Sequence, residues 1–562
     1  MVPLCFAVFV YVLAFFNVSF ATVLSERRSF ARELPVRQYL ESVETGMNAT
    51  GEAAIVTVSI SEDKQSFYTL VSAGNMTFRL ALDTGSSDLW VISSACSSSA
   101  CTSVPRYQLA YQSSTFIPVN SNSTAFNVSY EDGSIASGFI ARETLHLSNV
   151  TVASQAFGLV TSSNVSLTDD ISGILGLGFS RLSTIYNTVA NATPLFGSMA
   201  QQGLLDYPVF GLSLPRNKSV GSLTFGAIDG TVVQNRSLIE WEEVVPFAPF
   251  ANTTENTTSY LQWAVVLSGL SVNGTELTPL PTYPNATSNT SIALIDVGTP
   301  GIYGPYQDVS RLFSLIDGSR LVADGQWVIP CDANDTMAFN FGGQNFTMQP
   351  IDYLIGAVSG DPGLCLSWPM ALPPSADGID WQLGGAFLKT VYSIFSYGID
   401  TKEPPLIGFY PLNNASSPVQ SPEVVESYLS SASATVATTL PNYVLALPSY
   451  TTPPYAFNTS FTAPPGLVVS SGLAASTYSA ALGSASPNAT AIPTVTPSPT
   501  LVTLFITGTA GQVSTSVSTA SVPSVTLGEP PGWSNAASTV RIPTGLVLSG
   551  FCALLVSLLA RP

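Results

Sequence analysis

The stretches LALDTGSSDLW (80–90) and ALIDVGTPGIY (293–303) decide the fold of this 562-residue chain. In each, an apolar run precedes one aspartate, Asp83 or Asp296, and a predicted turn with glycine and hydroxyl residues follows it. A carboxylate inside an apolar run is costly unless it is bonded or used. The repeat predicts two similar lobes that face each other and bring the two carboxylates together.

A second repeated motif supports this interpretation. A Leu-Gly pair follows each aspartate at nearly the same distance, in GILGLG (173–178) and in WQLGGAF (381–387). From about residue 53 to 412, short alternating runs are punctuated by Gly, Asn and Ser, as is typical of β-strands. We therefore predict an all-β, bilobal fold, with lobes at 53–240 and 241–412.

Paired carboxylates can do hydrolytic chemistry without a cofactor. Two carboxylates in contact resist ionising together, so they share one proton over a broad acidic range. One can take a proton from a water molecule while the other polarises a carbonyl. The single histidine, His146, excludes a multi-histidine metal site and would have to carry any Ser-His-Asp mechanism alone. We expect neither a metal nor a cofactor.

The charge balance excludes one class of partner. Only 10% of residues are charged, and 18 Lys and Arg stand against 36 Asp and Glu, for a net charge of −18. Such a chain repels nucleic acid and suits an acidic environment.

The sequences at both ends of the chain are typical of segments that are removed during processing. The apolar run at 3–21 predicts a signal peptide over 1–22, and the basic residues that follow suggest a short pro-segment or leader over 23–52. The apolar tail 545–560 is short for a membrane span. Because small residues and a spacer precede it, we predict a glycosylphosphatidylinositol (GPI) attachment signal over 536–562, with Asn535 as the attachment site. A plain single-span tail is the alternative.

The region 413–535 differs from the rest in composition. Between Glu426 and Glu529 there is no Asp, Glu, Lys, Arg or His, and Ser, Thr, Ala and Pro dominate. This favours a disordered, O-glycosylated stalk. Nineteen N-x-S/T sequons outside the signal peptide suit a glycosylated surface protein.

Four cysteines remain once the terminal segments are set aside: Cys96, Cys101, Cys331 and Cys365. An even number in a secreted chain implies disulfides. Three pairings are possible, and locality favours Cys96–Cys101 and Cys331–Cys365.

From about residue 53 to 412 the chain resembles the pepsin-like aspartic peptidases, with DTGSSDLW as the specific match and ILGLG as support. The resemblance implies two β lobes, a deep cleft and a β-hairpin flap over an extended peptide. The predicted stalk and anchor suggest the fungal, GPI-anchored yapsin-like branch.

The resemblance also implies roles for individual residues. Asp83 and Asp296 match the catalytic dyad. The residues that match its support are Thr84, Gly85, Ser86, Gly298 and Thr299. The residues that match the flap and substrate-binding positions are Tyr130, Asp132, Gly133 and Ser134, with Trp90 supporting the flap tyrosine.

The second motif departs from the family pattern. Val297 stands where the family has Thr or Ser, whose hydroxyl braces the dyad from below. Its loss removes one buried hydrogen bond, about 1–3 kcal/mol if the partner goes unpaired. Since Thr84 can brace from its own side, we expect a looser dyad with the reaction type unchanged. Pro300 and Gly385 are further departures, with small structural effects expected.

Asp132 invites two interpretations. At the flap tip, a carboxylate would attract a substrate Lys or Arg near the scissile bond. It is equally a residue that forms turns before glycine.

These patterns predict a secreted, surface-anchored, monomeric aspartic endopeptidase that hydrolyses extended peptides at acidic pH and meets the membrane through a lipid anchor. The alternative is a catalytically impaired cell-wall glycoprotein with a binding or structural role. A glycosidase with two carboxylates is chemically possible, but DTGSSDLW argues against it.

Overall fold

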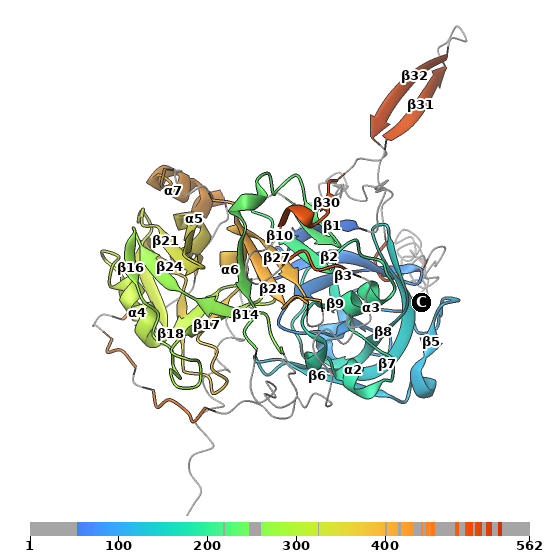
Figure 1. The fold of residues 1–562 in the computed structure, drawn as a ribbon, viewed down its shortest axis with the longest axis horizontal. Coiled ribbons are helices and arrows are strands. Elements are labelled where there is room, and N and C mark those ends of the chain that lie inside the picture. The colour runs from blue at the N-terminus through green and yellow to red at the C-terminus, as the bar shows by residue number, and fades with distance from the viewer. Residues whose placement is uncertain are drawn as a thin grey trace, which may run out of the picture. The chain divides into compact units, whose positions relative to one another are not determined.

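The computed structural model describes residues 53–530, with gaps at 217–219, 247–259, 324, 400–401, 414–417, 432–434, 437–439, 442–444, 449, 456–477, 483–488, 498–500, 508–512 and 520–525 (Figure 1). The predicted signal peptide, pro-segment, Asn535 and GPI signal lie outside the described residues.

The N-terminal half is built mainly from strands. Its elements are β1 (Ala54–Ile60), β2 (Phe67–Ala73), β3 (Met76–Asp83), β4 (Leu89–Ile92), α1 (Ser99–Thr102), β5 (Ile117–Pro118), η2 (Val119–Asn122), β6 (Ala125–Ser129), β7 (Ile135–Leu147), β8 (Val150–Ser163), β9 (Ile171–Gly176), η3 (Ser180–Leu182), α2 (Thr184–Thr188), α3 (Leu195–Gln201), β10 (Val209–Ser213), β11 (Gly221–Phe225), β12 (Ile228–Asp229), η4 (Arg236–Leu238) and β13 (Glu240–Glu243).

The C-terminal half is also strand-rich. Its elements are β14 (Ala264–Leu267), β15 (Gly269–Val272), β16 (Thr275–Leu277), β17 (Ser291–Ile295), β18 (Ile302–Pro305), α4 (Tyr306–Phe313), β19 (Arg320–Ala323), β20 (Gln326–Pro330), β21 (Met337–Phe341), β22 (Gln344–Met348), α5 (Pro350–Tyr353), β23 (Leu354–Val358), β24 (Asp361–Ser367), β25 (Met370–Leu372), β26 (Trp381–Leu383), α6 (Gly385–Leu388), β27 (Val391–Ser396) and β28 (Leu406–Pro411).

One large sheet joins the two halves. Its order is β13-β28-β27-β10-β11-β1-β2-β3-β9-β4-β8-β7-β5, so β27 and β28 from the end of the C-terminal half insert beside strands of the N-terminal half. Smaller sheets, β14-β17-β26-β18-β25 among them, complete the C-terminal half. The predicted all-β, pepsin-like fold is confirmed.

The two aspartate motifs lie in the same local topology. In the N-terminal half β3 pairs parallel to β9, β9 pairs antiparallel to β4, and β4 pairs parallel to β8. In the C-terminal half β17, β26, β18 and β25 repeat these three pairings with the same directions. The Leu-Gly motifs thus hold the aspartate strands: Asp83 is in register with Gly176, and Ile295 with Leu383.

An aromatic core lies behind the first aspartate loop. The Trp263 ring lies 4.2 Å from that of Phe179, and the indole Nε1–H of Trp263 donates to the Leu177 carbonyl at 3.0 Å. The Tyr397 hydroxyl donates to the same carbonyl at 2.7 Å. Because the Leu177 N–H donates to the Asp83 carbonyl at 2.7 Å, residues of both halves fix the position of Asp83.

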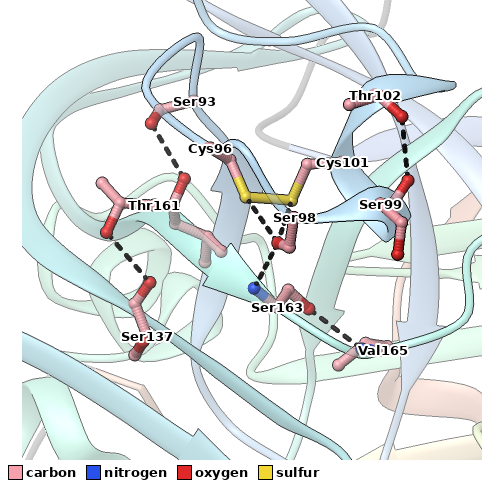
Figure 2. Close-up of a disulfide and its surroundings, with 11 residues drawn as sticks. Ser93, Cys96, Ser98, Ser99, Cys101, Thr102, Ser137, Thr161, Ser163 and Val165 are labelled. Carbon is pink, nitrogen blue, oxygen red and sulfur yellow. Dashed lines mark hydrogen bonds between the residues drawn. A yellow bond between two sulfur atoms is a disulfide. The ribbon is translucent and has the colours of Figure 1, made fainter.

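Both favoured disulfide pairs are present. Figure 2 shows Cys96 bonded to Cys101, with the Ser98 hydroxyl 3.2 and 3.4 Å from their sulfurs. Ser98 also accepts the Ser163 N–H at 3.0 Å, which ties this loop to the end of β8 (Figure 2). Cys331 is bonded to Cys365, a residue of β24.

The described parts of 413–530 contain further elements: α7 (Pro422–Ser431), β29 (Thr435–Val436), η6 (Ala489–Ala491), β30 (Thr494–Val495), β31 (Leu501–Thr507) and β32 (Val513–Thr519). Several contact the two halves. Val425 of α7 is buried in the main core, β29 pairs with β23, and β30 pairs with β12. The composition of this region gave no sign of these contacts.

Within the described ranges, no helix combines the length and apolar character needed to cross a membrane.

Candidate active site

The two aspartate loops meet. Asp83 ends β3 and Asp296 directly follows β17, and their side chains are only 8% and 9% exposed. The Gly85 N–H donates to Oδ1 of Asp83 at 2.8 Å and to Oδ1 of Asp296 at 2.9 Å. One amide thus bonds both carboxylates, so the pair that the repeat predicted is brought into one place.

The glycines of both loops allow this close approach. A Cβ atom at Gly298 would lie 2.6 Å from Oδ1 of Asp83, and one at Gly85 would lie 3.0 Å from Oδ2 of Asp296. Each loop therefore presents bare backbone to the carboxylate of the other. The Gly298 N–H donates to Oδ1 of its own Asp296 at 2.9 Å.

Hydroxyl groups bond the outer carboxylate oxygens. Ser86 Oγ donates to Oδ2 of Asp83, and Thr299 Oγ1 donates to Oδ2 of Asp296 at 2.7 Å. Each carboxylate therefore accepts one hydroxyl on Oδ2, whereas Oδ1 accepts one amide in Asp83, from Gly85, and two in Asp296, from Gly85 and Gly298.

A hydroxyl group of the first aspartate loop, that of Thr84, hydrogen-bonds the backbone of the second loop beneath the dyad. Thr84 Oγ1 donates to the Ile295 carbonyl at 2.9 Å and accepts the Val297 N–H at 3.0 Å. The Val297 side chain is buried in the hydrophobic core. Thus valine preserves the packing, while the hydroxyl bonding across the two loops rests on Thr84.

Burial and charge act on the dyad. Burial first, and then the negative charge of Asp296, raise the pKa of the Asp83 carboxyl above its usual range, while bonds from Ser86 and Gly85 partly offset this. The pair therefore retains one proton at pH values where an isolated aspartate has lost it.

The turn of the β6–β7 hairpin carries Tyr130, the residue predicted to lie in the flap. The Trp90 indole N–H donates to the Tyr130 hydroxyl at 2.8 Å, as the resemblance implied. Burial, and then the negative charge of Asp83, raise the pKa of the Tyr130 phenol above its usual range. Gly133 has φ +80°, as the tight turn requires.

At the flap tip, Asp132 Oδ1 accepts the Ser134 N–H at 2.8 Å. This is the turn-forming bond of the second interpretation. The attraction of a basic substrate by Asp132, which is exposed, stays a prediction.

The sequence reading missed a contact from the flap to the C-terminal half. Gln382 Nε2 donates to Glu131 Oε2 at 3.0 Å. Gln382 lies on β26, beside the strand that leads to Asp296. Partial desolvation raises the pKa of the Glu131 carboxyl, the bond from Gln382 lowers it, and the charges of Asp377 and Asp296 raise it further. Glu131 directly follows Tyr130 in the chain, but no sequence pattern links it to Gln382.

Asp88, inside DTGSSDLW, was also missed. Its buried carboxylate accepts the Thr184 N–H and the Thr184 hydroxyl, both at 2.7 Å, and the Ser183 hydroxyl at 2.5 Å. It therefore anchors the start of α2 to the residue that precedes β4.

Across the residues that the structure describes, no three His, Cys, Asp or Glu side chains gather as a metal site.

Comparison with known proteins agrees with this geometry. The family described as eukaryotic aspartyl protease matches residues 66–403, more than half of the chain. The aspartic protease of Phaffia rhodozyma is 33% identical over 58% of this chain and 73% of its own length. Major aspartyl peptidase 1 of Cryptococcus neoformans is 29% identical over 66% and 72%, and vacuolar protease A of Neurospora crassa is 31% identical over 58% and 74%. The chain therefore belongs to the eukaryotic aspartyl protease family and is an aspartic-type endopeptidase.

Proposed function

We propose that Asp83 and Asp296 are the catalytic dyad of this endopeptidase and cleave extended peptides at acidic pH. The observation that carries the proposal is the Gly85 N–H, which bonds both carboxylates and holds them in contact. A water molecule bound between their free faces meets a base and an acid at once.

The reaction follows from the shared proton. The ionised carboxylate takes a proton from the water, whose oxygen attacks the scissile carbonyl carbon. The protonated carboxyl donates a hydrogen bond to the carbonyl oxygen, where negative charge develops. When the tetrahedral intermediate collapses, the C–N bond breaks, and the carboxyl that took the proton from the water donates it to the leaving nitrogen. Tyr130, held by Trp90, keeps the flap over the reacting bond.

Cleavage of denatured haemoglobin tests this assignment. We expect the purified chain to cut it at about pH 3–5, within the range where the dyad holds one proton, and a statine-type inhibitor to block it. Asp83→Asn should abolish cleavage, while Asp132→Asn, which changes an exposed flap carboxylate, should leave cleavage of an uncharged peptide intact. Undiminished cleavage by Asp83→Asn would exclude this dyad.

Val297 supports a second candidate function, a catalytically impaired glycoprotein of the cell wall with a binding or structural role. Val297→Thr discriminates between the two. A large gain in turnover over the natural chain would favour impairment, whereas similar turnover supports a working dyad braced by Thr84 alone.

For Asp132 we propose a preference for Lys or Arg near the scissile bond. Matched peptides with Lys or Leu before the cut measure it. If the ratio of their cleavage rates is unchanged by Asp132→Ala, Asp132 serves only the turn.

We also propose that the protein is monomeric, enters the secretory pathway, and is held at the cell surface by a GPI anchor at Asn535, as a yapsin-like protein of a fungus. The two disulfides support an oxidising compartment, and the terminal sequences support processing at both ends. Release of the protein from cells by a phosphatidylinositol-specific phospholipase, lost in Asn535→Gln, tests the anchor. Persistence of the hydrophobic tail in the mature chain would instead indicate a membrane span.

A further inference from the structure

A segment of the region beyond residue 412 packs against the peptidase body. We call residues 478–482 and 489–497 the docked segment. The Leu482 side chain is 0% exposed and packs in a cluster with Tyr207, Val209 and Ile399. A leucine inside the core is not expected of a stalk that serves only as a spacer.

A buried carboxylate binds the backbone of this segment. Glu403 is 1% exposed, and its Oε2 accepts the Leu482 N–H at 2.7 Å and the Ala481 N–H at 3.1 Å. The same oxygen accepts the Tyr207 hydroxyl at 2.7 Å, and Oε1 accepts the Ser396 hydroxyl at 3.2 Å. Without the segment, Glu403 would lose two of its four donors at a buried site, which is unfavourable for a carboxylate.

The guanidinium group of Arg236 binds the second part of the docked segment, residues 489–497. Arg236 Nη1 donates to the carbonyls of Ala489 at 2.9 Å, Thr490 at 3.0 Å and Ile492 at 2.7 Å. The Ile492 side chain is buried in the same cluster as Leu482. Glu403 thus binds backbone N–H groups and Arg236 binds backbone carbonyls.

Strand pairing extends this contact. β30 pairs parallel to β12, with the Ile228 N–H donating to the Pro493 carbonyl at 2.9 Å and the Gly230 N–H to the Val495 carbonyl at 2.8 Å. Addition of an extended segment to a strand, with side-chain pockets for specificity, is a general mode of peptide recognition.

From these contacts we infer that the body carries a peptide-binding groove, separate from the active site, whose occupant is the docked segment of the same chain. Glu403 and Arg236 recognise its backbone, and the Leu482 pocket selects its register. The folded unit therefore extends to residue 497, and a chain cut after residue 412 lacks part of its core. This inference does not depend on the dyad being active.

Hydrogen exchange on the full-length chain tests the inference. In the natural chain, the amides of Ala481 and Leu482 should be protected. Leu482→Asp should speed exchange across the docked segment by at least about tenfold. The matched control is Leu447→Asp, which makes the same change at a leucine that is 57% exposed and should leave the docked segment protected.

Glu403→Gln provides a second variant. It replaces one carboxylate oxygen, which accepts hydrogen bonds, with an amide NH2 group, which can only donate them. It should also speed exchange of the docked segment. Full exposure of these amides in the natural chain, or equal exchange in Leu482→Asp and Leu447→Asp, would overturn the inference. Peptide cleavage measured on the same samples reports separately on the dyad.

Discussion

Because Val297 has no hydroxyl, the alignment of the two aspartate loops depends more on Thr84 than it would if both loops carried a hydroxyl at this position. Thr84→Val removes the hydroxyl that donates to the Ile295 carbonyl at 2.9 Å and accepts the Val297 N–H at 3.0 Å. Both backbone groups adjoin Asp296, and the site is buried. The volume of the side chain hardly changes, so the loss is one of hydrogen bonding.

The magnitude follows from the two bonds. Each contributes about 1 kcal/mol net, and a buried group left unpaired costs about 1–3 kcal/mol. We therefore expect Thr84→Val to lower the free energy of unfolding by about 2–4 kcal/mol. Because the two loops would lose their mutual alignment, turnover should fall by about tenfold or more.

Urea unfolding and cleavage of a quenched peptide at acidic pH measure the two effects. Thr84→Ser is the matched control, because it keeps the hydroxyl and should retain most of the stability and activity. In a Val297→Thr background, Thr84→Val should cost less, since a second hydroxyl can brace the loops. Wild-type stability and turnover in Thr84→Val would refute this account of the brace.

Three further predictions concern the dyad and the flap. Gly298→Ala places a methyl group 2.6 Å from Oδ1 of Asp83 and should abolish peptide cleavage, whereas Gly197→Ala, whose nearest contact would be 3.5 Å, should remain active. Because the pKa of Asp83 is raised in the folded state, its contribution to stability is full below the ordinary aspartate range and is lost as the pH rises through the folded-state pKa; urea titrations over pH should show a shallower decline for Asp83→Asn. Gln382→Ala removes the bond from β26 to the flap and should speed association of a statine-type inhibitor in stopped-flow experiments; an unchanged association rate would show that this bond does not limit flap opening.

Short sequence motifs were sufficient to predict the positions of the two aspartate loops. Asp83 and Asp296 stand in repeated motifs, and the Leu-Gly pairs lie on the strands beside them, at Gly176 and Leu383. Such motifs can be read from sequence because backbone geometry requires glycine and small hydroxyl residues at fixed positions around each carboxylate.

Contacts between distant segments could not be read in the same way. Glu131 and Gln382 meet only because the flap reaches the C-terminal half. Leu482 lies in a stretch without charged residues whose composition favours a spacer, yet a buried Glu403 binds its backbone N–H. Backbone recognition leaves little trace in sequence, since every residue except proline carries an N–H group.

The dyad can be observed most directly through its shared proton. Infrared spectra of the full chain labelled with ¹³C-aspartate, recorded at about pH 5, where ordinary aspartates are ionised, can be compared with those of Asp83→Asn and Asp296→Asn. The account predicts a protonated-carboxyl band in both difference spectra, because removing either partner removes the pair that holds the proton. Absence of this band from either difference spectrum would contradict a dyad that shares one proton.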